Sequence, residues 1–234
     1  MQRAFYLLAP GGWRDYANLL HAPYTVWHLS YVVLGAALVP DPDYGLMVWT
    51  LLAFLLAMGV GAHIFDELHD RPLRTTIPSF TLWGIGLVAV ALAVLIGLIV
   101  GLAATPLILP LIAIGALLVF AYNLEWGPFH HDLVFAFAWG AFPVLTSYIA
   151  QTGTLSATSV LAAVIAAALS SVQRTLSTRV RHLRRNVIGV SGHLVEFTGD
   201  DTTLTIEWLL QDHERVLLLL SLVVPAVSVV VLLK

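Results

Sequence analysis

The chain contains no cysteine and little charge: of its 234 residues, 11% are charged and 59% are hydrophobic. Without cysteine, neither a disulfide framework nor a thiolate metal site is possible. The mean hydropathy of +0.89 lies well above the range of a water-soluble domain. Walker loops, nucleophile elbows and Gly-x-Gly-x-x-Gly fingerprints are also lacking, and we expect no nucleic-acid partner. The composition indicates a protein that lies largely in a lipid bilayer.

The polar residues divide the chain into apolar stretches. A bilayer core takes about 20 apolar residues per helix, and seven stretches approach that length. They run from Tyr24 to Pro40, Tyr44 to Phe65, Phe80 to Ala103, Pro106 to Ala121, Leu133 to Ala150, Ser156 to Leu176 and Val216 to Leu233. We therefore predict an all-α fold, with one transmembrane domain over residues 1–234 and seven spanning helices. The first stretch is not expected to be a cleaved signal peptide, because a polar segment precedes it.

Basic residues are missing from every second gap between these stretches. Arginines precede the first stretch, follow the second and gather after the sixth, whereas the other gaps have neither Lys nor Arg. Under the positive-inside rule, this pattern predicts a cytoplasmic N-terminus and an external C-terminus. We expect an integral protein of a prokaryotic plasma membrane. Nearly all the histidines and most of the acids fall in the same inner gaps, so a polar site should open on the cytoplasmic side.

The sharpest motif closes the second stretch and reads from Gly61 to Leu73. In a continuous helix, His63, Asp66, Glu67 and Asp70 share one face, and Pro72 then ends the helix. Two carboxylates one turn apart are suited to Mg²⁺, which prefers oxygen ligands and a shared phosphate. Arg71 and Arg74 would add positive charge for that phosphate. The alternative is a solvated helix end whose acids pair with arginines.

At this motif the chain resembles the UbiA superfamily of intramembrane prenyltransferases. Asp66 and Asp70 match the aspartates of its first motif, and Arg71-Pro72-Leu73 matches the tripeptide that follows. The segments Asn18 to Tyr24 and Ala121-Tyr122-Asn123, followed by Asp132 to Gly153, resemble the opening and the middle of the family. Ala62 replaces the leading asparagine of the motif, and the usual spacer before the tripeptide is missing.

The family's second acidic motif is replaced in this chain. The segment Ser171 to Arg179 carries neutral and cationic side chains at that place, and the usual eighth and ninth spans are absent. Arginines can neutralise phosphate oxygens directly, which predicts one metal cluster facing a wall of arginines. The alternative is that these arginines anchor the topology and contact anionic lipids.

The resemblance implies Mg²⁺-assisted ionisation of an isoprenyl diphosphate, followed by prenyl transfer or terpene cyclisation. Asp66 and Asp70 would hold Mg²⁺, and Glu67 would assist them. The expected substrate-binding residues are Arg71, Arg74, Arg174, Arg179, Arg181, Tyr122, Asn123 and His63. Acceptor, chain length and oligomeric state stay open.

Two alternatives come from other classes of protein. A non-catalytic UbiA-like protein would bind a lipid or a partner, which the replaced acidic motif favours. An iron enzyme is the other: Asp66-x-x-His69 has the spacing of helix-bundle iron sites, and His28, His63, His130 and His131 would converge with it.

Residues 186–214 form the only sizeable polar segment. Alternation from Val187 to Phe197 and from Thr203 to Trp208, around the turn residues Thr198 to Asp201, predicts a cytoplasmic β-hairpin. It would cover the inner cavity as a lid or serve as a docking surface, and a lone hairpin should lean on the bundle.

Overall fold

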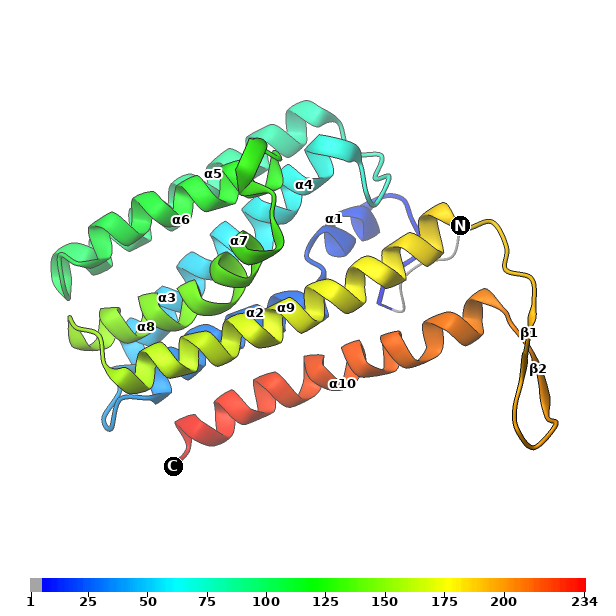
Figure 1. Cartoon of the computed structure of the whole chain (residues 1–234). Coiled ribbons are helices and arrows are strands. Elements are labelled where there is room, and N and C mark those ends of the chain that lie inside the picture. Colours follow the sequence, from blue (N-terminus) through cyan, green and yellow to red (C-terminus); the bar gives the residue numbers. More distant parts are fainter. Residues whose placement is uncertain (1–5) are drawn as a thin grey trace.

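The computed structural model describes residues 6–234, so Arg3, one of the arginines behind the predicted topology, lies outside the described part. Helices dominate, and they run back and forth along one direction (Figure 1). Successive helices connect two sides of the bundle: a polar end, where the short α1 (Trp13–Leu19) lies, and an opposite apolar end.

Each apolar stretch of the sequence coincides with a helix or a continuous helical run. In chain order the first four are α2 (Ala22–Ala37), the run of α3 (Tyr44–Phe54), η1 (Leu55–Ala62) and α4 (His63–Asp70), then α5 (Ser79–Ala103) and α6 (Ile108–Asn123). A short 3₁₀ turn, η2 (Gly127–Phe129), precedes the run of α7 (Asp132–Ala136), η3 (Phe137–Ala141) and α8 (Phe142–Thr152), and α9 (Ala157–Asn186) and α10 (Ile206–Leu232) complete the bundle.

Within residues 6–234, five helical runs are long and apolar enough to cross a membrane. Ala22–Ala37 and Ile108–Asn123 have 16 residues each, which is below the roughly 17–25 residues of a typical span. The structure thus shows a helical protein with five candidate spans, and the prediction of seven spans is not confirmed.

Local sequence explains where the main helices begin and end. Asp43 accepts a hydrogen bond from the Leu46 amide at the start of α3, and Ser156 and Ser159 form a reciprocal capping box at the start of α9. Arg71 adopts a left-handed conformation just before Pro72, which ends α4 at Asp70 as the sequence predicted.

Two π-helical segments interrupt the long runs. η1 contains Gly59 and Gly61, and η3 contains Gly140. Such insertions in α-helices are frequent at functional sites. Here η1 leads directly into the acidic helix α4, and η3 carries Trp139.

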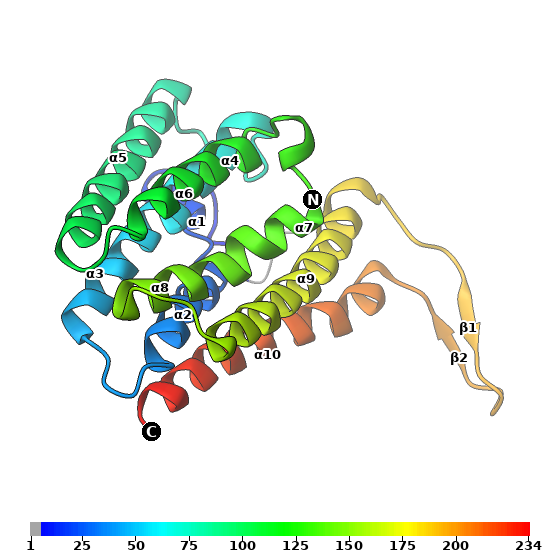
Figure 2. The ribbon, with the colours of Figure 1, turned by 60° about the vertical axis from the view of Figure 1, so that its left-hand side comes forward.

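The bundle is held by close helix contacts. α2 packs between α8 and α10, and α9 packs on α7, η3 and α10, whereas α5 covers α3, η1 and α6 on the other side (Figure 2). The Ser147 hydroxyl donates to the Val32 carbonyl oxygen at 2.7 Å, which ties α8 to α2. Aromatic residues fill the interior around Phe65, Tyr122, Trp139 and Phe142.

The polar segment forms a smaller hairpin than predicted. β1 (His193–Val195) and β2 (Asp201–Thr203) pair antiparallel, with Leu194 opposite Thr202. The prediction of a strand that reaches Trp208 is wrong, because α10 begins at Ile206. Thr205 caps this helix by accepting a hydrogen bond from the Trp208 amide. The hairpin projects away from the bundle rather than leaning on it (Figures 1 and 2), so it is not positioned as a lid.

Candidate functional site

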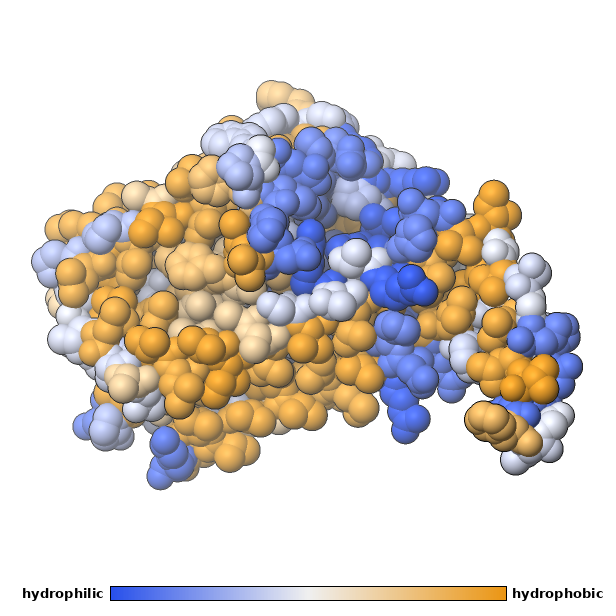
Figure 3. Space-filling view, viewed as in Figure 1, coloured by the Kyte–Doolittle hydropathy of each residue, from blue (hydrophilic) through white to orange (hydrophobic). Residues whose placement is uncertain are grey.

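A cavity of about 600 Å³ opens at the polar end of the bundle. Figure 3 shows hydrophilic side chains gathered around a hollow there, whereas the rest of this face is mainly apolar. The lining comes from the segment before α1, from α1, α2, α4 and the loop after it, from the end of α6 and the loop before α7, from α7 and η3, and from the C-terminal half of α9.

The acidic helix α4 forms one wall of this cavity. His63, Asp66 and Asp70 all line it, as the helical spacing predicted. Asp66 is half-buried and Asp70 is exposed. Arg181 and Arg185 are the positive charges that act most strongly on Asp66. Asp66 and Asp70 therefore present carboxylate oxygens to the same polar space, and this donor set fits Mg²⁺.

Glu67 has a different place from its helical neighbours. Its side chain is fully buried, and its carboxylate accepts hydrogen bonds from the Leu73 amide at 2.9 Å and from the Thr75 amide and hydroxyl at 2.8 and 2.9 Å. These bonds fold the loop after α4 back onto the helix. Glu67 is not among the residues that line the cavity, so the geometry does not support the expected assistance to a metal ion.

Arg71 also serves the loop after α4. Its guanidinium donates to the Ile77 carbonyl oxygen at 2.7 Å and to the Ser79 hydroxyl at 2.6 Å, and it is not part of the cavity lining. Arg74 does line the cavity. Of the two arginines that the motif offered for phosphate, the structure therefore brings only Arg74 to the site.

Arginines of α9 form the opposite wall. Arg174 and Arg181 line the cavity, and so do Arg184 and Arg185, whereas Arg179 points elsewhere and is exposed. One helical turn separates Arg181 from Arg185 and Arg184, so these side chains share the inner face of the helix. Arg184 also forms an ion pair with Glu214 of α10 at 2.6 Å.

Arg174 is held in place from several sides. Its Nε donates to the Asp132 carboxylate at 3.1 Å, and its guanidinium carbon lies 5.7 Å from the Tyr122 ring centre and 5.3 Å from the Phe135 ring centre. Both distances suit cation–π contacts. Such contacts fix a charged group that would otherwise be mobile, which favours binding of an anion at a defined position.

Aromatic rings form the floor of the cavity. Tyr122 and Phe135 lie 4.7 and 5.3 Å from the Trp139 ring. Trp139 also lines a second, apolar cavity of about 110 Å³ between α3, η1, α5, α6 and α8. The floor is therefore a boundary between a polar space and an apolar space inside the bundle.

Two buried polar atoms of the cavity lining lack a hydrogen-bond partner within residues 6–234. They are the Tyr122 hydroxyl and Gln173 Oε1, and both residues are at least nine-tenths buried. An unpaired buried polar group costs about 1–3 kcal/mol, which a polar ligand would offset. Asn123, also in the lining, already donates from its amide nitrogen to the Val119 carbonyl oxygen.

Three buried or half-buried histidines lie deeper in the cavity. The His21 and His63 rings are 4.7 Å apart, and His63 and His28 are tethered through Nδ1 to the backbone carbonyl oxygens of Gly59 and Trp139. Burial lowers the pKa of His21, so its ring is neutral at pH 7. His131 does not line the cavity; its Nδ1 accepts a hydrogen bond from the Leu133 amide.

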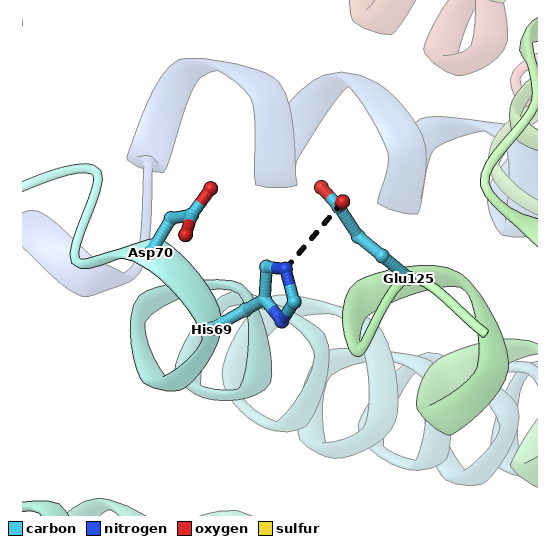
Figure 4. A group of neighbouring side chains, drawn as sticks. All are labelled: His69, Asp70 and Glu125. Atoms are coloured by element: carbon cyan, nitrogen blue, oxygen red, sulfur yellow. Dashed lines mark ion pairs between the residues drawn. The ribbon is translucent and has the colours of Figure 1, made fainter. Parts of the chain in front are cut away.

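A further group lies at the rim of the cavity, where His69 and Asp70 at the end of α4 face Glu125 in the loop after α6 (Figure 4). The His69 Nε2 atom is 3.5 Å from a Glu125 carboxylate oxygen. The sequence placed these residues in the inner gaps but gave no signal that Glu125 meets α4. It also gave no sign that Tyr6 lines the cavity, since a single polar residue without a motif carries no spatial information.

No family model matches the chain, and no curated protein is significantly similar to it. The resemblance to the UbiA superfamily therefore rests on the residues named above and stays a prediction.

Proposed function

We propose that the chain is an intramembrane enzyme of the UbiA type that ionises an isoprenyl diphosphate, for prenyl transfer or for terpene cyclisation. In this proposal all seven apolar helices span the bilayer, and the polar end with its cavity faces the cytoplasm. The observation that carries it is the meeting of two distant sequence segments: Asp66 and Asp70 line the same 600 Å³ cavity as Arg174 and Arg181.

The diphosphate would bind between the two walls. Arg74, Arg174 and Arg181 would donate charge-assisted hydrogen bonds to its oxygens. Asp66 and Asp70 would hold Mg²⁺, which when bound neutralises phosphate charge and so makes the diphosphate a better leaving group. The Tyr122 hydroxyl and Gln173 supply unpaired polar atoms for the same ligand.

The isoprenyl chain would extend from the polar space toward the apolar cavity. On ionisation, the bond between C1 and the diphosphate oxygen breaks, and the oxygen keeps the electron pair. The allylic cation left on the hydrocarbon would lie against the aromatic floor, where the faces of Tyr122 and Trp139 stabilise positive charge. Capture by an acceptor or by a double bond of the same chain, followed by loss of a proton, then gives the product.

Two observations favour the alternatives. Val195 and Phe197 are strongly exposed on a projecting hairpin, which favours a partner-binding protein without catalytic activity. The histidines of the cavity favour an iron enzyme, but one carboxylate-x-x-His pair is half of the usual bundle site. A lipid-binding protein would use the arginines of α9 for anionic head groups, but it does not require Asp66 and Asp70 in the same cavity.

Release of diphosphate from isoprenyl diphosphates by the purified protein, with and without Mg²⁺, tests the proposal. We expect Asp66→Asn and Asp70→Asn to lower the rate by about 100-fold, the order expected when a group that stabilises the transition state is removed. Asp200→Asn, on the exposed hairpin turn, is the matched control and should keep the rate. Release that is unaffected by the first two substitutions would refute the site.

A further inference from the structure

We propose that His69, Asp70 and Glu125 bind a divalent first-row transition metal ion at the rim of the cavity, in a site distinct from the carboxylate-only position at Asp66. The proposal shares Asp70 with the proposed function but does not require isoprenoid chemistry. It extends the site from α4 to the loop after α6, which the sequence motif does not include.

The geometry brings three ligand atoms together from two elements. One ligand atom from each of His69, Asp70 and Glu125 lies within 4.8 Å of the others (Figure 4). Ligands bound at about 2.0–2.2 Å from one ion lie at most about 4.4 Å apart, so small side-chain rotations close the site. All three residues are exposed, so the site is open to an ion from solution.

The ligand set selects the class of metal. Mg²⁺ and Ca²⁺ are bound almost entirely by oxygen, whereas imidazole nitrogen suits Zn²⁺, Fe²⁺, Co²⁺ and related ions. One histidine with two carboxylates therefore favours a transition metal ion over Mg²⁺. Three protein ligands also leave coordination positions for water or for a phosphate oxygen.

The surroundings hold Glu125 in position. His130 Nε2 lies 3.6 Å from the other Glu125 carboxylate oxygen, and His130 Nδ1 is bonded to the Tyr122 carbonyl oxygen at 3.0 Å. The Arg174 guanidinium lies 3.4 Å from the same His130 Nε2, which accepts from Arg174 when it carries no proton and pairs with Glu125 when it carries one. His130 thus lies between Glu125 at the rim and the arginine wall of the cavity.

The test is metal binding by the full-length protein, purified without a histidine tag and treated with a chelator. Titration with Co²⁺, followed by its visible absorption, and with Zn²⁺, followed by calorimetry, should show one ion per chain. We expect His69→Gln and Glu125→Gln to weaken binding by at least about tenfold, whereas His182→Gln, an exposed histidine of α9 outside the cavity, should not.

Two results would overturn the proposal: no saturable Co²⁺ binding, or binding that His69→Gln leaves unchanged while the protein keeps its thermal stability. Asp66→Asn separates this proposal from the proposed function. It should retain Co²⁺ binding and lose Mg²⁺-dependent diphosphate release. Co²⁺ binding without any diphosphate release would refute the proposed function alone, and release without Co²⁺ binding would refute the metal site alone.

Discussion

At the scale of single residues, neighbouring acids of α4 have different tasks. Glu67 is completely buried and satisfied by loop hydrogen bonds, whereas Asp70 is exposed and lines the cavity. On a helix the two residues are only about 60° apart around the axis, so the covering of Glu67 by the loop after α4, rather than the helix face, gives these two acids of one motif different surroundings.

This difference predicts opposite outcomes for matched substitutions. Glu67→Gln should lower the free energy of unfolding by about 2 to 4 kcal/mol, because an amide cannot accept all the bonds that the buried carboxylate accepts. Asp70→Asn should leave stability nearly unchanged. Thermal unfolding of the purified variants in detergent measures both, and equal melting temperatures would contradict the role assigned to Glu67.

Asp15 makes a second buried link, between α1 and the loop after α4. Its carboxylate accepts hydrogen bonds from the Gly11 amide at 2.8 Å and from the Thr76 amide and hydroxyl at 3.0 and 2.9 Å. The Gly11 bond, followed by those of Thr76, lowers the pKa of Asp15. The ionised form is therefore the one that stabilises the fold.

A carboxyl group whose pKa is lower in the folded than in the unfolded state stabilises the fold at pH values above its unfolded pKa of about 3.9. This stabilisation is lost as the pH falls through the pKa of the folded state. When the pH is lowered below about 4, we expect the melting temperature of the native protein to decrease more than that of Asp15→Asn, because the variant has already lost this contribution. Parallel melting curves for the two proteins across this range would show that the link is not important.

At the scale of elements, close helix contacts depend on glycine. A Cβ atom on Gly35 of α2 would clash with the Val144 carbonyl oxygen and would lie 2.8 Å from the Ser147 Cβ atom of α8. Both neighbours belong to a packed helix, so the helices would have to separate.

We therefore expect Gly35→Ala to destabilise the protein by about 1 to 3 kcal/mol. Gly84→Ala is the matched control: its Cβ atom would meet nothing within 4 Å, and it should leave stability unchanged or raise it by up to about 1 kcal/mol. Thermal unfolding distinguishes the two, and a stable Gly35→Ala protein would contradict the close approach of α2 and α8.

The elements also show how far the sequence leads. The length of the apolar stretches located every long helix, because an apolar stretch long enough to cross a bilayer has few alternatives to a helix. The spacing of a helix placed His63, Asp66 and Asp70 on one wall of the cavity. The π-helical segments were not foreseen, since their sequences are ordinary apolar helix. The strand predicted from Thr203 to Trp208 is correct only at Thr203, where β2 ends, because alternation over so few residues also fits a capped helix start. The contact between Glu125 and His69 depends on tertiary packing alone.

At the scale of the whole molecule, charge is concentrated at one end. The loops after α4 and α6, the C-terminal half of α9 and the hairpin all lie at the polar end, while the opposite end is mainly apolar. With arginines at that end, the positive-inside rule predicts that the cavity faces the cytoplasm.

Reporter fusions test this orientation. Alkaline phosphatase, which is active only outside the cytoplasm, should be active when fused after Lys234 and inactive when inserted at Gly199 in the hairpin turn. A green fluorescent protein should give the reverse pattern. Activity of the phosphatase at Gly199 would place the cavity on the outer side and contradict the proposed access of substrate.

The central claim is that the arginine wall of α9 binds a diphosphate. Affinity for geranyl, farnesyl and geranylgeranyl thiodiphosphates, which resist ionisation, measures it directly. Loss of one charged hydrogen-bond donor costs about 1.5–3 kcal/mol, so Arg174→Ala and Arg181→Ala should each weaken binding by at least about tenfold. Arg179→Ala, on the same helix but outside the cavity, should bind as the native protein does. The claim would be contradicted if Arg174→Ala and Arg181→Ala bound the thiodiphosphates as tightly as the native protein does, or if Arg179→Ala lost as much affinity as they do.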